Sequence, residues 1–360
     1  MAISPDVVAT ALQDLAPGYS ELFTLWHPIM ERVVKKGNID RGTLKGPYKE
    51  FVVTTDGPGQ VTQVITGSEV IAGGRRQNAS RGNSFAPRMI YAFDVPGKDL
   101  AEANGENDLA KIIKAYPELA LSDFHERIAT QLAMGTGTGV GGFPTFNGQT
   151  TYNPQGTARQ GIFEYAAPAA QGDVVFGLTK TGGVGGVAGW NNQYADITSF
   201  AANGRQRMQE VYYLASSEGS KTMGPVDLLL GDQTSYLNYL DDLDQQVRVV
   251  KIEGDKAPPM IRKGVAFLEA DFFMERSIDP TGHTLAAADG VIYFIHSSSS
   301  SWHLYTVGHN SSMETKGDFD IRGPIRIPEQ DMWRYEYVLN MGMYCDQLRC
   351  NGVVTGANTP

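Results

Sequence analysis

Cysteine is scarce in this sequence, and long apolar runs are absent. The 360 residues include only two cysteines, Cys345 and Cys350. An odd offset within one strand points side chains to opposite faces, so we expect two buried, reduced thiols and no disulfide. No apolar run approaches the ~20 residues that a membrane-spanning helix needs. The N-terminus lacks a basic region followed by a hydrophobic one, so we expect a cytoplasm-like compartment and no membrane contact.

Positive charge is the minority charge. The chain has 30 Lys and Arg against 40 Asp and Glu, which gives a formal net charge of -10. Dedicated nucleic-acid binders usually carry a basic stripe, so this balance argues against that class, and we expect any DNA contact to be weak and local. The high content of Gly (41) and Pro (18) predicts many turns and extended segments. The length suffices for one large or two medium domains.

Residues 46–93 predict a β-ribbon with no core of its own. Strand patterns run from 48 to 55, from 61 to 66 and from 85 to 93, with a turn at 56–59. No acidic residue occurs between Ile71 and Phe93, although several arginines do. A ribbon this thin is not stable alone, so we expect it to lie on another subunit.

The arginines of the ribbon have two interpretations. They could keep an exposed strand edge soluble, or they could meet carboxylates on a neighbouring subunit, for which the acidic region between Asp99 and Glu126 is a candidate. We favour the second interpretation because Arg forks suit interface carboxylates. Each exposed pair adds only about 0 to 1 kcal/mol, so the effect would come from their number. The predicted inter-subunit contact residues are Arg75, Arg76, Arg81, Arg88 and Phe85.

Helical periodicity is clearest in three places. Residues 106–134 predict a two-part helical rod that restarts at Pro117. Residues 198–217 predict a long helix with Met208, Val211, Tyr212 and Ala215 on its buried stripe. The third helix is capped by Asp232 and has the apolar face Tyr236, Leu240, Leu243 and Val247. Residues 1–45 predict a partly ordered arm with an apolar stretch near Ile29 and a basic end at Arg32, Lys35 and Lys36.

Strand patterns dominate the second half of the chain. They cover 226–230, 264–273 and 290–295, and we expect 297–301 to join 290–295 to 302–307 as a hairpin. The alternation of Trp333, Tyr335, Tyr337 and Leu339 with polar residues predicts a long, half-buried final strand. Residues 135–189 are Gly-rich with little regular pattern, which is typical of a functional surface loop.

None of the motifs in this sequence predicts a nucleotide-binding, metal-binding or catalytic site. The glycines of 135–142 follow a helix and lack the Gly-Lys-Ser/Thr of a phosphate loop. His296, His303 and His309 are spaced six and five residues apart, but structural or surface roles are more common than a metal site at such spacing. Asp241, Asp242 and Asp244 fit a solvated helix face better than a cation site. We therefore predict no catalytic residues, no metal and no cofactor.

Three local sequences, together with the order of the elements, resemble one protein family. They are Trp190-Asn-Asn-Gln-Tyr194 with Asn203-Gly204 before a long helix, Leu228-Leu-Leu-Gly-Asp232 with Ser235-Tyr236, and the late strand Trp333-Arg-Tyr-Glu-Tyr337. They resemble the major capsid proteins of tailed bacteriophages. The resemblance covers nearly the whole chain and implies the α+β Hong-Kong-ninety-seven-like, or Johnson, fold.

That resemblance implies a division of the chain. It gives an N-terminal arm (1–45), an extended loop (46–93), a peripheral domain (94–222 and 326–360) with a spine helix at about 106–134, and an axial domain (223–325). The Gly-rich stretch of 135–189 is longer than the family pattern suggests. No long charged helical segment precedes the arm, which implies a separate scaffolding protein.

The resemblance also implies a function and partners. It implies self-assembly through hexamers and pentamers into an icosahedral shell around double-stranded DNA, in a virion assembled in the host cytoplasm. The implied partners are other copies of the chain, a scaffolding protein, a portal protein and a decoration protein. An encapsulin-like cargo shell of the same fold and a Gly-rich β-hydrolase remain as alternatives. Some relatives link an arm lysine to an asparagine of a neighbouring subunit in an isopeptide bond. Lys49 with Asn340 or Asn351 would be the candidates here, but no spacing supports them.

Overall fold

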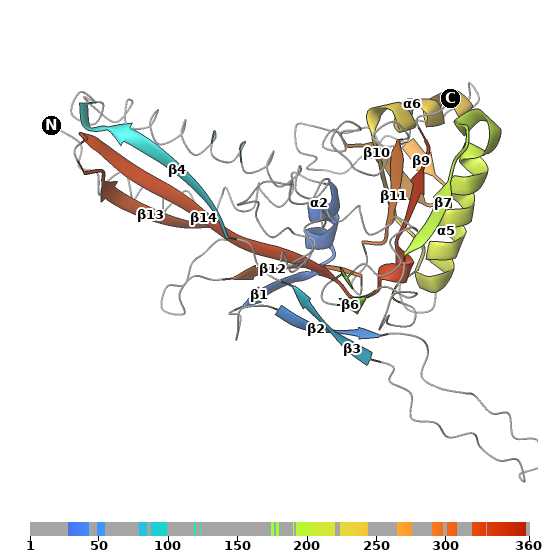
Figure 1. The fold of residues 1–360 in the computed structure, drawn as a ribbon, viewed down its shortest axis with the longest axis horizontal. Coiled ribbons are helices and arrows are strands. Elements are labelled where there is room, and N and C mark those ends of the chain that lie inside the picture. Colours follow the sequence, from blue (N-terminus) through green and yellow to red (C-terminus); the bar gives the residue numbers. More distant parts are fainter. Residues whose placement is uncertain are drawn as a thin grey trace, which may run out of the picture.

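The structure is a computed structural model with two sheets as its main elements (Figure 1). The residues that it describes are 28–42, 49–54, 79–84, 88–98, 119, 123, 174–175, 178–179, 190, 192–219, 224–243, 265–275, 290–297, 301–307, 319–328 and 330–357.

The first sheet has five strands and is built around one long strand. Its members are β1 (Ile39–Gly42), β4 (Arg88–Pro96), β12 (Trp302–Val307), β13 (Phe319–Arg326) and β14 (Met332–Cys345). The C-terminal part of β14 pairs with β12, which in turn pairs with β1. Its N-terminal part lies between β4 and β13. We call this three-stranded part the projecting sheet, because it extends away from the rest of the molecule (Figure 1).

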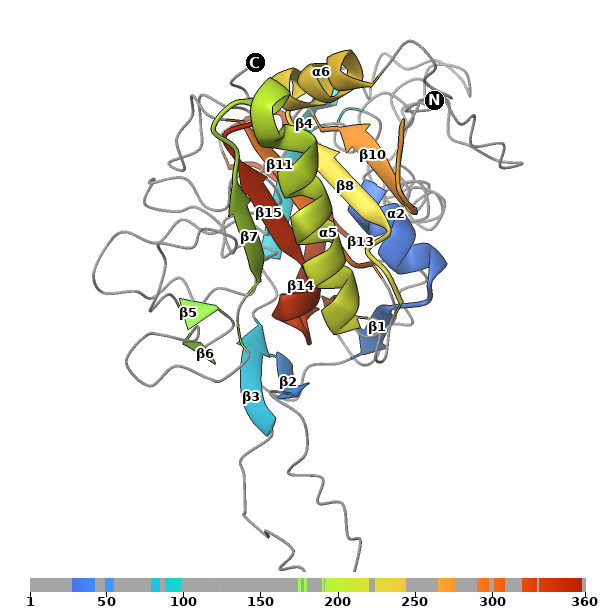
Figure 2. The same cartoon turned by 90° about the vertical axis from the view of Figure 1, so that its right-hand side faces the viewer.

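The second sheet has six strands, parallel and antiparallel, in the order β7-β15-β11-β8-β10-β9. Their bounds are β7 (Gln193–Asp196), β15 (Gly352–Thr355), β11 (Val291–Ile295), β8 (Leu228–Gly231), β10 (Ala270–Met274) and β9 (Val265–Phe267). Helix α5 (Arg205–Gly219), preceded by a π-helical turn (Phe200–Gly204), crosses one face of the sheet, as Figure 2 shows. Helix α6 (Gln233–Asp242) follows β8.

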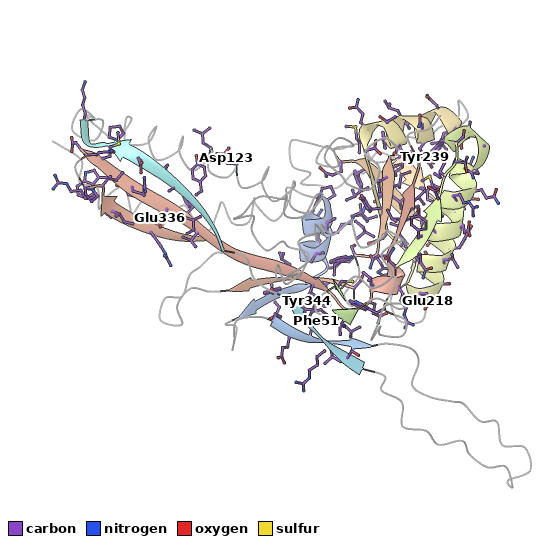
Figure 3. The ribbon with its side chains drawn as sticks, in the orientation of Figure 1. Phe51, Asp123, Glu218, Tyr239, Glu336 and Tyr344 are labelled. Carbon is purple, nitrogen blue, oxygen red and sulfur yellow. The ribbon has the colours of Figure 1, made fainter. Side chains whose placement is uncertain are left out.

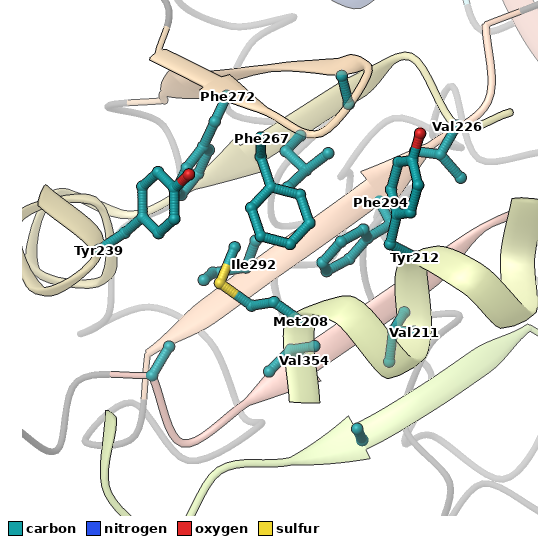
Figure 4. Close-up of a cluster of buried hydrophobic side chains, with 14 of the residues drawn as sticks. Met208, Val211, Tyr212, Val226, Tyr239, Phe267, Phe272, Ile292, Phe294 and Val354 are labelled. Atoms are coloured by element: carbon teal, nitrogen blue, oxygen red, sulfur yellow. The ribbon is translucent and has the colours of Figure 1, made fainter. Parts of the chain in front are cut away.

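The main core lies between α5, α6 and the six-stranded sheet (Figure 4). All four residues of the predicted α5 stripe are buried, which confirms that helix. β8 contributes Leu229, and Phe272, Ile292 and Phe294 come from its neighbours. Asp232 is the N-cap of α6, as predicted, and accepts hydrogen bonds from the backbone N–H groups of Thr234 and Ser235. The most buried aromatic of α6 is Tyr239, which the predicted apolar face omitted.

The remaining elements are short. They are α2 (Pro28–Lys35), the pair β2 (Lys49–Thr54) and β3 (Ala79–Ser84), the pair β5 (Val174–Val175) and β6 (Leu178–Thr179), and a 3-10 turn (Leu348–Cys350). No helix in the described ranges is long and apolar enough to span a membrane.

The prediction of one continuous ribbon over 46–93 is wrong. β3 pairs with β2, but β4, which covers most of the predicted strand at 85–93, pairs with β14 instead. Strand alternation is a local signal and does not say which strand will be the neighbour, which explains the error. The predicted turn at 56–59 and the strand at 61–66 lie outside the described residues.

Two further strand predictions are wrong. The segment predicted as one strand at 264–273 contains the hairpin β9–β10, which turns at Leu268 and Glu269. The sequence did not mark this turn, because it contains no glycine, proline or asparagine. β11 and β12 do not pair as a hairpin, since β11 lies in the six-stranded sheet and β12 in the five-stranded sheet. The serines at 297–301 are as compatible with a change of sheet as with a turn.

The sheets do not divide at the predicted boundary between 222 and 223. β7, α5 and β15 pack with the six-stranded sheet, although the sequence division placed them in the peripheral domain. β12 and β13 lie in the five-stranded sheet, although that division placed them in the axial domain. Strand β15 inserts between β7 and β11, and such a long-range insertion leaves no local signal in the sequence.

Candidate assembly surface

The base of the β2–β3 pair is anchored on the five-stranded sheet. Phe51 and Val53 of β2 are buried, and the Phe51 ring stacks on Tyr344 of β14 with 4.6 Å between centroids (Figure 3). Gly82 of β3 lies directly opposite Phe51, where an added Cβ would come within 2.6 Å of the ring. Glycine at 82 therefore lets the Phe51 ring cover β3 and fix the pair on the sheet.

The outward face of the same pair carries an exposed apolar side chain and a pair of opposite charges. Val52 is 60% exposed, and the side chain of Arg81, its direct partner across the ladder, is 80% exposed. Glu50 lies on this face too, but its carboxylate is 3.8 Å from the Arg81 guanidinium, so the ion pair is loose. Arg81 is thus exposed, next to an exposed apolar side chain that sequence reasoning missed.

Of the other predicted contact residues, only the backbone of Arg88 lies in the described part of the chain. Arg88 begins β4, opposite Asn340, and so belongs to a different sheet from Arg81. The side chain of Arg88 lies outside the described residues, as do Arg75, Arg76 and Phe85. The period of two in a strand places Phe51 and Val53 on one face and Val52 on the other, but three apolar residues in a row do not show which face is buried.

The projecting sheet has one aromatic face. The Phe93 ring of β4 stacks on Tyr335 and Tyr337 of β14, with centroid distances of 5.6 Å and 5.7 Å. Burial raises the pKa of Tyr91, and the nearby Asp123 carboxylate, which accepts its hydrogen bond, raises it further (Figure 3). Asp123 is helical, as is Leu119, the other described residue of the predicted 106–134 helix. Part of that segment therefore lies beside the aromatic face.

The opposite face of the projecting sheet is mixed. Arg334 of β14 donates two hydrogen bonds, of 2.8 Å and 3.0 Å, to the Asp94 carboxylate of β4. The hydrogen bonds from Arg334 hold the pKa of Asp94 below its usual value. Pro324 and a bulge interrupt β13 at the border of this sheet. Proline has no N–H to donate, so β13 is a poor template for an added strand.

Asn351 joins the two sheets. Its Oδ1 accepts hydrogen bonds from the backbone N–H of His296, after β11, and from Nε1 of Trp302, in β12, both at 3.0 Å. Its Nδ2 donates to Gln347 O at 3.2 Å and to Ser301 Oγ at 3.4 Å. Asn351 is buried, so these bonds fix how the sheets meet where the chain passes from one to the other.

The basic end of the predicted arm binds the six-stranded sheet. Arg32 of α2 donates to Asp227 O at 2.7 Å and pairs with Asp271. Lys36 binds the Asp227 carboxylate, which also accepts from the backbone N–H of Ser297 at 2.8 Å. Burial alone would raise the pKa of Asp227, but the hydrogen bonds from Lys36 and Ser297 outweigh it and lower the pKa.

In the described parts of the chain, the histidines considered as metal ligands bind different partners. His296 binds Gly224 O at 2.9 Å, whereas His303 pairs with Asp346 at 3.0 Å. No group of His, Cys, Asp and Glu there could hold a metal ion. Lys49 pairs with Asp40.

The cysteines are free and buried, as predicted, but the reason given was wrong. Cys345 ends β14, whereas Cys350 lies in the following 3-10 turn, so the two do not share a strand. Burial raises the pKa of Cys350 to about 11, which leaves this thiol protonated and unreactive near neutral pH.

The fold is similar to that of subunits in solved capsids. A chain of the cyanophage A-1(L) capsid asymmetric unit matches with a TM-score of 0.58 at 11% identity, over 95% of this chain and 94% of that one. A chain of the native GTA particle capsid matches with a TM-score of 0.52 at 9% identity, over 90% of each chain. A chain of the bacteriophage PhiM1 mature capsid matches with a TM-score of 0.51 at 9% identity, over 90% of this chain and 87% of that one. No family model and no curated protein sequence matches this chain.

These matches define the class of fold. The chain has the α+β Hong-Kong-ninety-seven-like fold of tailed-phage capsid subunits, over nearly its whole length. At this level the fold predicted from the order of elements is confirmed.

Proposed function

We propose that this chain is the major capsid protein of a tailed bacteriophage. It self-assembles through hexamers and pentamers into an icosahedral shell that encloses double-stranded DNA. The observation that carries the proposal is the match of 95% of the chain to 94% of a capsid subunit, which leaves little of it for another activity. Its role is structural, and its working parts are surfaces that meet other copies.

The elements can be assigned to parts of such a subunit. In this proposal β2 and β3 are the base of the extended loop, Leu119 and Asp123 belong to the spine helix, and the projecting sheet is part of the peripheral domain. The six-stranded sheet with α5 and α6 is the core of the axial domain. The N-terminal arm ends at α2, which its basic residues bind to that sheet.

The loop of 46–93 is the proposed inter-subunit clasp. The exposure of Arg81 and Val52 supports this role, because both side chains point away from the body of their own subunit. Arg75, Arg76 and Phe85 remain proposed members of the same contact, whereas Arg88 lies in the five-stranded sheet and would meet a neighbouring subunit separately. Many weak pairs repeated around a shell add up where one exposed pair contributes little.

The proposed partners follow from the role in a virion. They are other copies of the chain, a separate scaffolding protein, a portal protein and a decoration protein. The net charge of -10 would keep packaged DNA from adhering to the inner wall, so contact with DNA is weak. Assembly takes place in the host cytoplasm.

Negative-stain microscopy of the purified chain tests the proposal. We expect closed shells with fivefold and sixfold clusters, empty or filled with nucleic acid. Shells that enclose a co-purified protein and no nucleic acid would favour the encapsulin-like alternative. Discrete monomers at every protein and salt concentration tested would contradict both shell functions and leave the enzyme alternative.

A further inference from the structure

One exposed residue has a backbone conformation that its type rarely adopts. Leu268 occupies the first position of the two-residue turn between β9 and β10, with φ at +54°. Glycine, asparagine and aspartate are the residues that favour such turns, and a bulky side chain with positive φ is strained. The Leu268 side chain is also 47% exposed. A strained conformation that displays leucine to solvent motivates a functional explanation.

A second exposed apolar side chain lies beside this turn. Tyr213 of α5 is 60% exposed and packs edge-on against Tyr212, with centroids 5.7 Å apart. Tyr212 in turn packs edge-on against Phe267, the residue before Leu268, at 5.9 Å. Tyr213 and Leu268 are thus the immediate sequence neighbours of two buried rings that pack together between α5, which Figure 2 shows in front of the six-stranded sheet, and β9. We call these two side chains the Tyr213–Leu268 patch.

The border of the Tyr213–Leu268 patch is acidic. Glu269 follows Leu268 in the turn and is exposed, and its carboxylate is close enough to help raise the pKa of Tyr212, after burial. Glu210 lies one helical turn before Tyr213 and is exposed, although Arg207 pairs with it at 2.6 Å. A partner for this patch should therefore present an apolar side chain next to a cation.

The chain itself presents that combination on the outward face of β2 and β3. Val52 and Arg81 face each other directly across this ladder, and both are among its most exposed side chains. We infer that the Tyr213–Leu268 patch is the contact site for the β2–β3 face of a second copy of this chain. Val52 packs on Leu268, and the Arg81 guanidinium meets the Glu269 carboxylate and the Tyr213 ring. The inference rests on the proposed shell function and names the place where its clasp is received.

Two substitutions at the turn separate this role from a purely structural one. Leu268→Asn relieves backbone strain, so we expect an unchanged or higher unfolding midpoint for the monomer. It also removes the apolar contact, so the concentration at half-assembly should rise roughly tenfold or more. Leu237 of α6 is 48% exposed and lies outside the patch, so Leu237→Asn is the matched control. We expect its half-assembly concentration to stay within about twofold of wild type.

A charge exchange tests the pairing itself. Glu269→Arg and Arg81→Glu should each weaken association, and the double variant should recover most of it, as measured by sedimentation velocity over a range of concentrations. Equal assembly of wild type, Leu268→Asn and both single charge variants would overturn the inference and leave the shell function standing. Rescue in oligomers that do not close into shells would support the contact and contradict the shell function. A wild type that is monomeric throughout would overturn both.

Discussion

Asn351 is the residue on which the junction between the two sheets depends. It is buried, and its amide binds the backbone N–H after β11 and the indole of β12 at the same time. It also bonds to the segment between β14 and β15 through Gln347 O. Asparagine can serve all of these partners because its amide both donates and accepts, which aspartate cannot do.

Replacing Asn351 by Asp should therefore destabilise the subunit strongly. The variant loses the Nδ2 donor and places a carboxylate in a buried site, which we expect to cost about 2–4 kcal/mol of unfolding free energy. Urea denaturation followed by tryptophan fluorescence measures this, since Trp302 lies at the site. Asn192→Asp, at a half-buried residue that bonds to the adjacent Gln193 carbonyl, is the control and should cost under about 1 kcal/mol. Equal losses in both variants would contradict a special role for Asn351.

Single residues were predictable where their signal is local. Asp232 could be recognised as a cap because the apolar periodicity of α6 begins directly after it. Leu268 could not be recognised as a turn residue, since nothing in the sequence Phe267-Leu268-Glu269-Ala270 marks a turn. Phe51 and Gly82 matter through their contact across the ladder, and a partner 31 residues away in the sequence is not visible from either strand alone.

The start of α6 can be tested through its capping carboxylate. Asp232 accepts hydrogen bonds from the N–H groups of Thr234 and Ser235, and from the N–H of Val291 in the neighbouring strand. Asp232→Ala leaves all three buried or partly buried donors without this acceptor, so we expect a loss of about 2–3 kcal/mol in unfolding free energy. Gln233→Ala, at the next and exposed position, should change it by less than about 0.5 kcal/mol. Thermal denaturation compares the two, and a similar small effect from both would rule out the cap as a stabilising contact.

Charged side chains bind helix α2 to the six-stranded sheet, and Ile29 and Val33 of this helix are buried. The hydrogen bonds from Lys36 and Ser297 lower the pKa of Asp227 below its ordinary value of about 3.9. Stability from this carboxylate is therefore fully present above that ordinary value, and it is lost as the pH falls through the lower pKa of the folded state.

Asp227→Asn should remove this part of the acid sensitivity. We expect it to cost about 1–3 kcal/mol near neutral pH, because a charged acceptor is lost, and the difference from wild type should shrink as the pH falls below about 4. Urea midpoints measured from pH 3 to 7 would show the convergence. Lys35→Met removes an exposed charge that, among the described residues, pairs with Glu31 of the same helix, and it should have little effect. A pH-independent difference for Asp227→Asn would show that its charge is not what binds α2.

Elements were predicted best where a periodic pattern ran for many residues. The stripe of α5 and the alternation of β14 identified both elements, and only the extent of β14, to Cys345, was missed. The hairpin expected from β11 and β12 was wrong because short strands can pair with any compatible edge. In the same way, the strand pattern of 48–55 predicted β2, but neither its pairing with β3 nor its anchor on Tyr344 could be predicted.

At the scale of the molecule, the described elements do not form one rounded body. The projecting sheet and the β2–β3 pair both extend from the centre, in different directions, while the six-stranded sheet lies at one end (Figure 1). Their exposed faces carry apolar and charged side chains side by side, such as Val52 with Arg81 and Tyr213 with Glu210. Extensions of this kind suit contacts in which one copy overlaps the next, and heterologous contacts can close into rings.

Sedimentation velocity of the wild-type chain over a hundredfold range of concentration tests the central claim most directly. Mutually dependent contacts predict a sharp onset, above which the 39.1 kDa subunit coexists with one fast-sedimenting closed particle and few intermediates. A single species of subunit mass at every concentration would contradict the account.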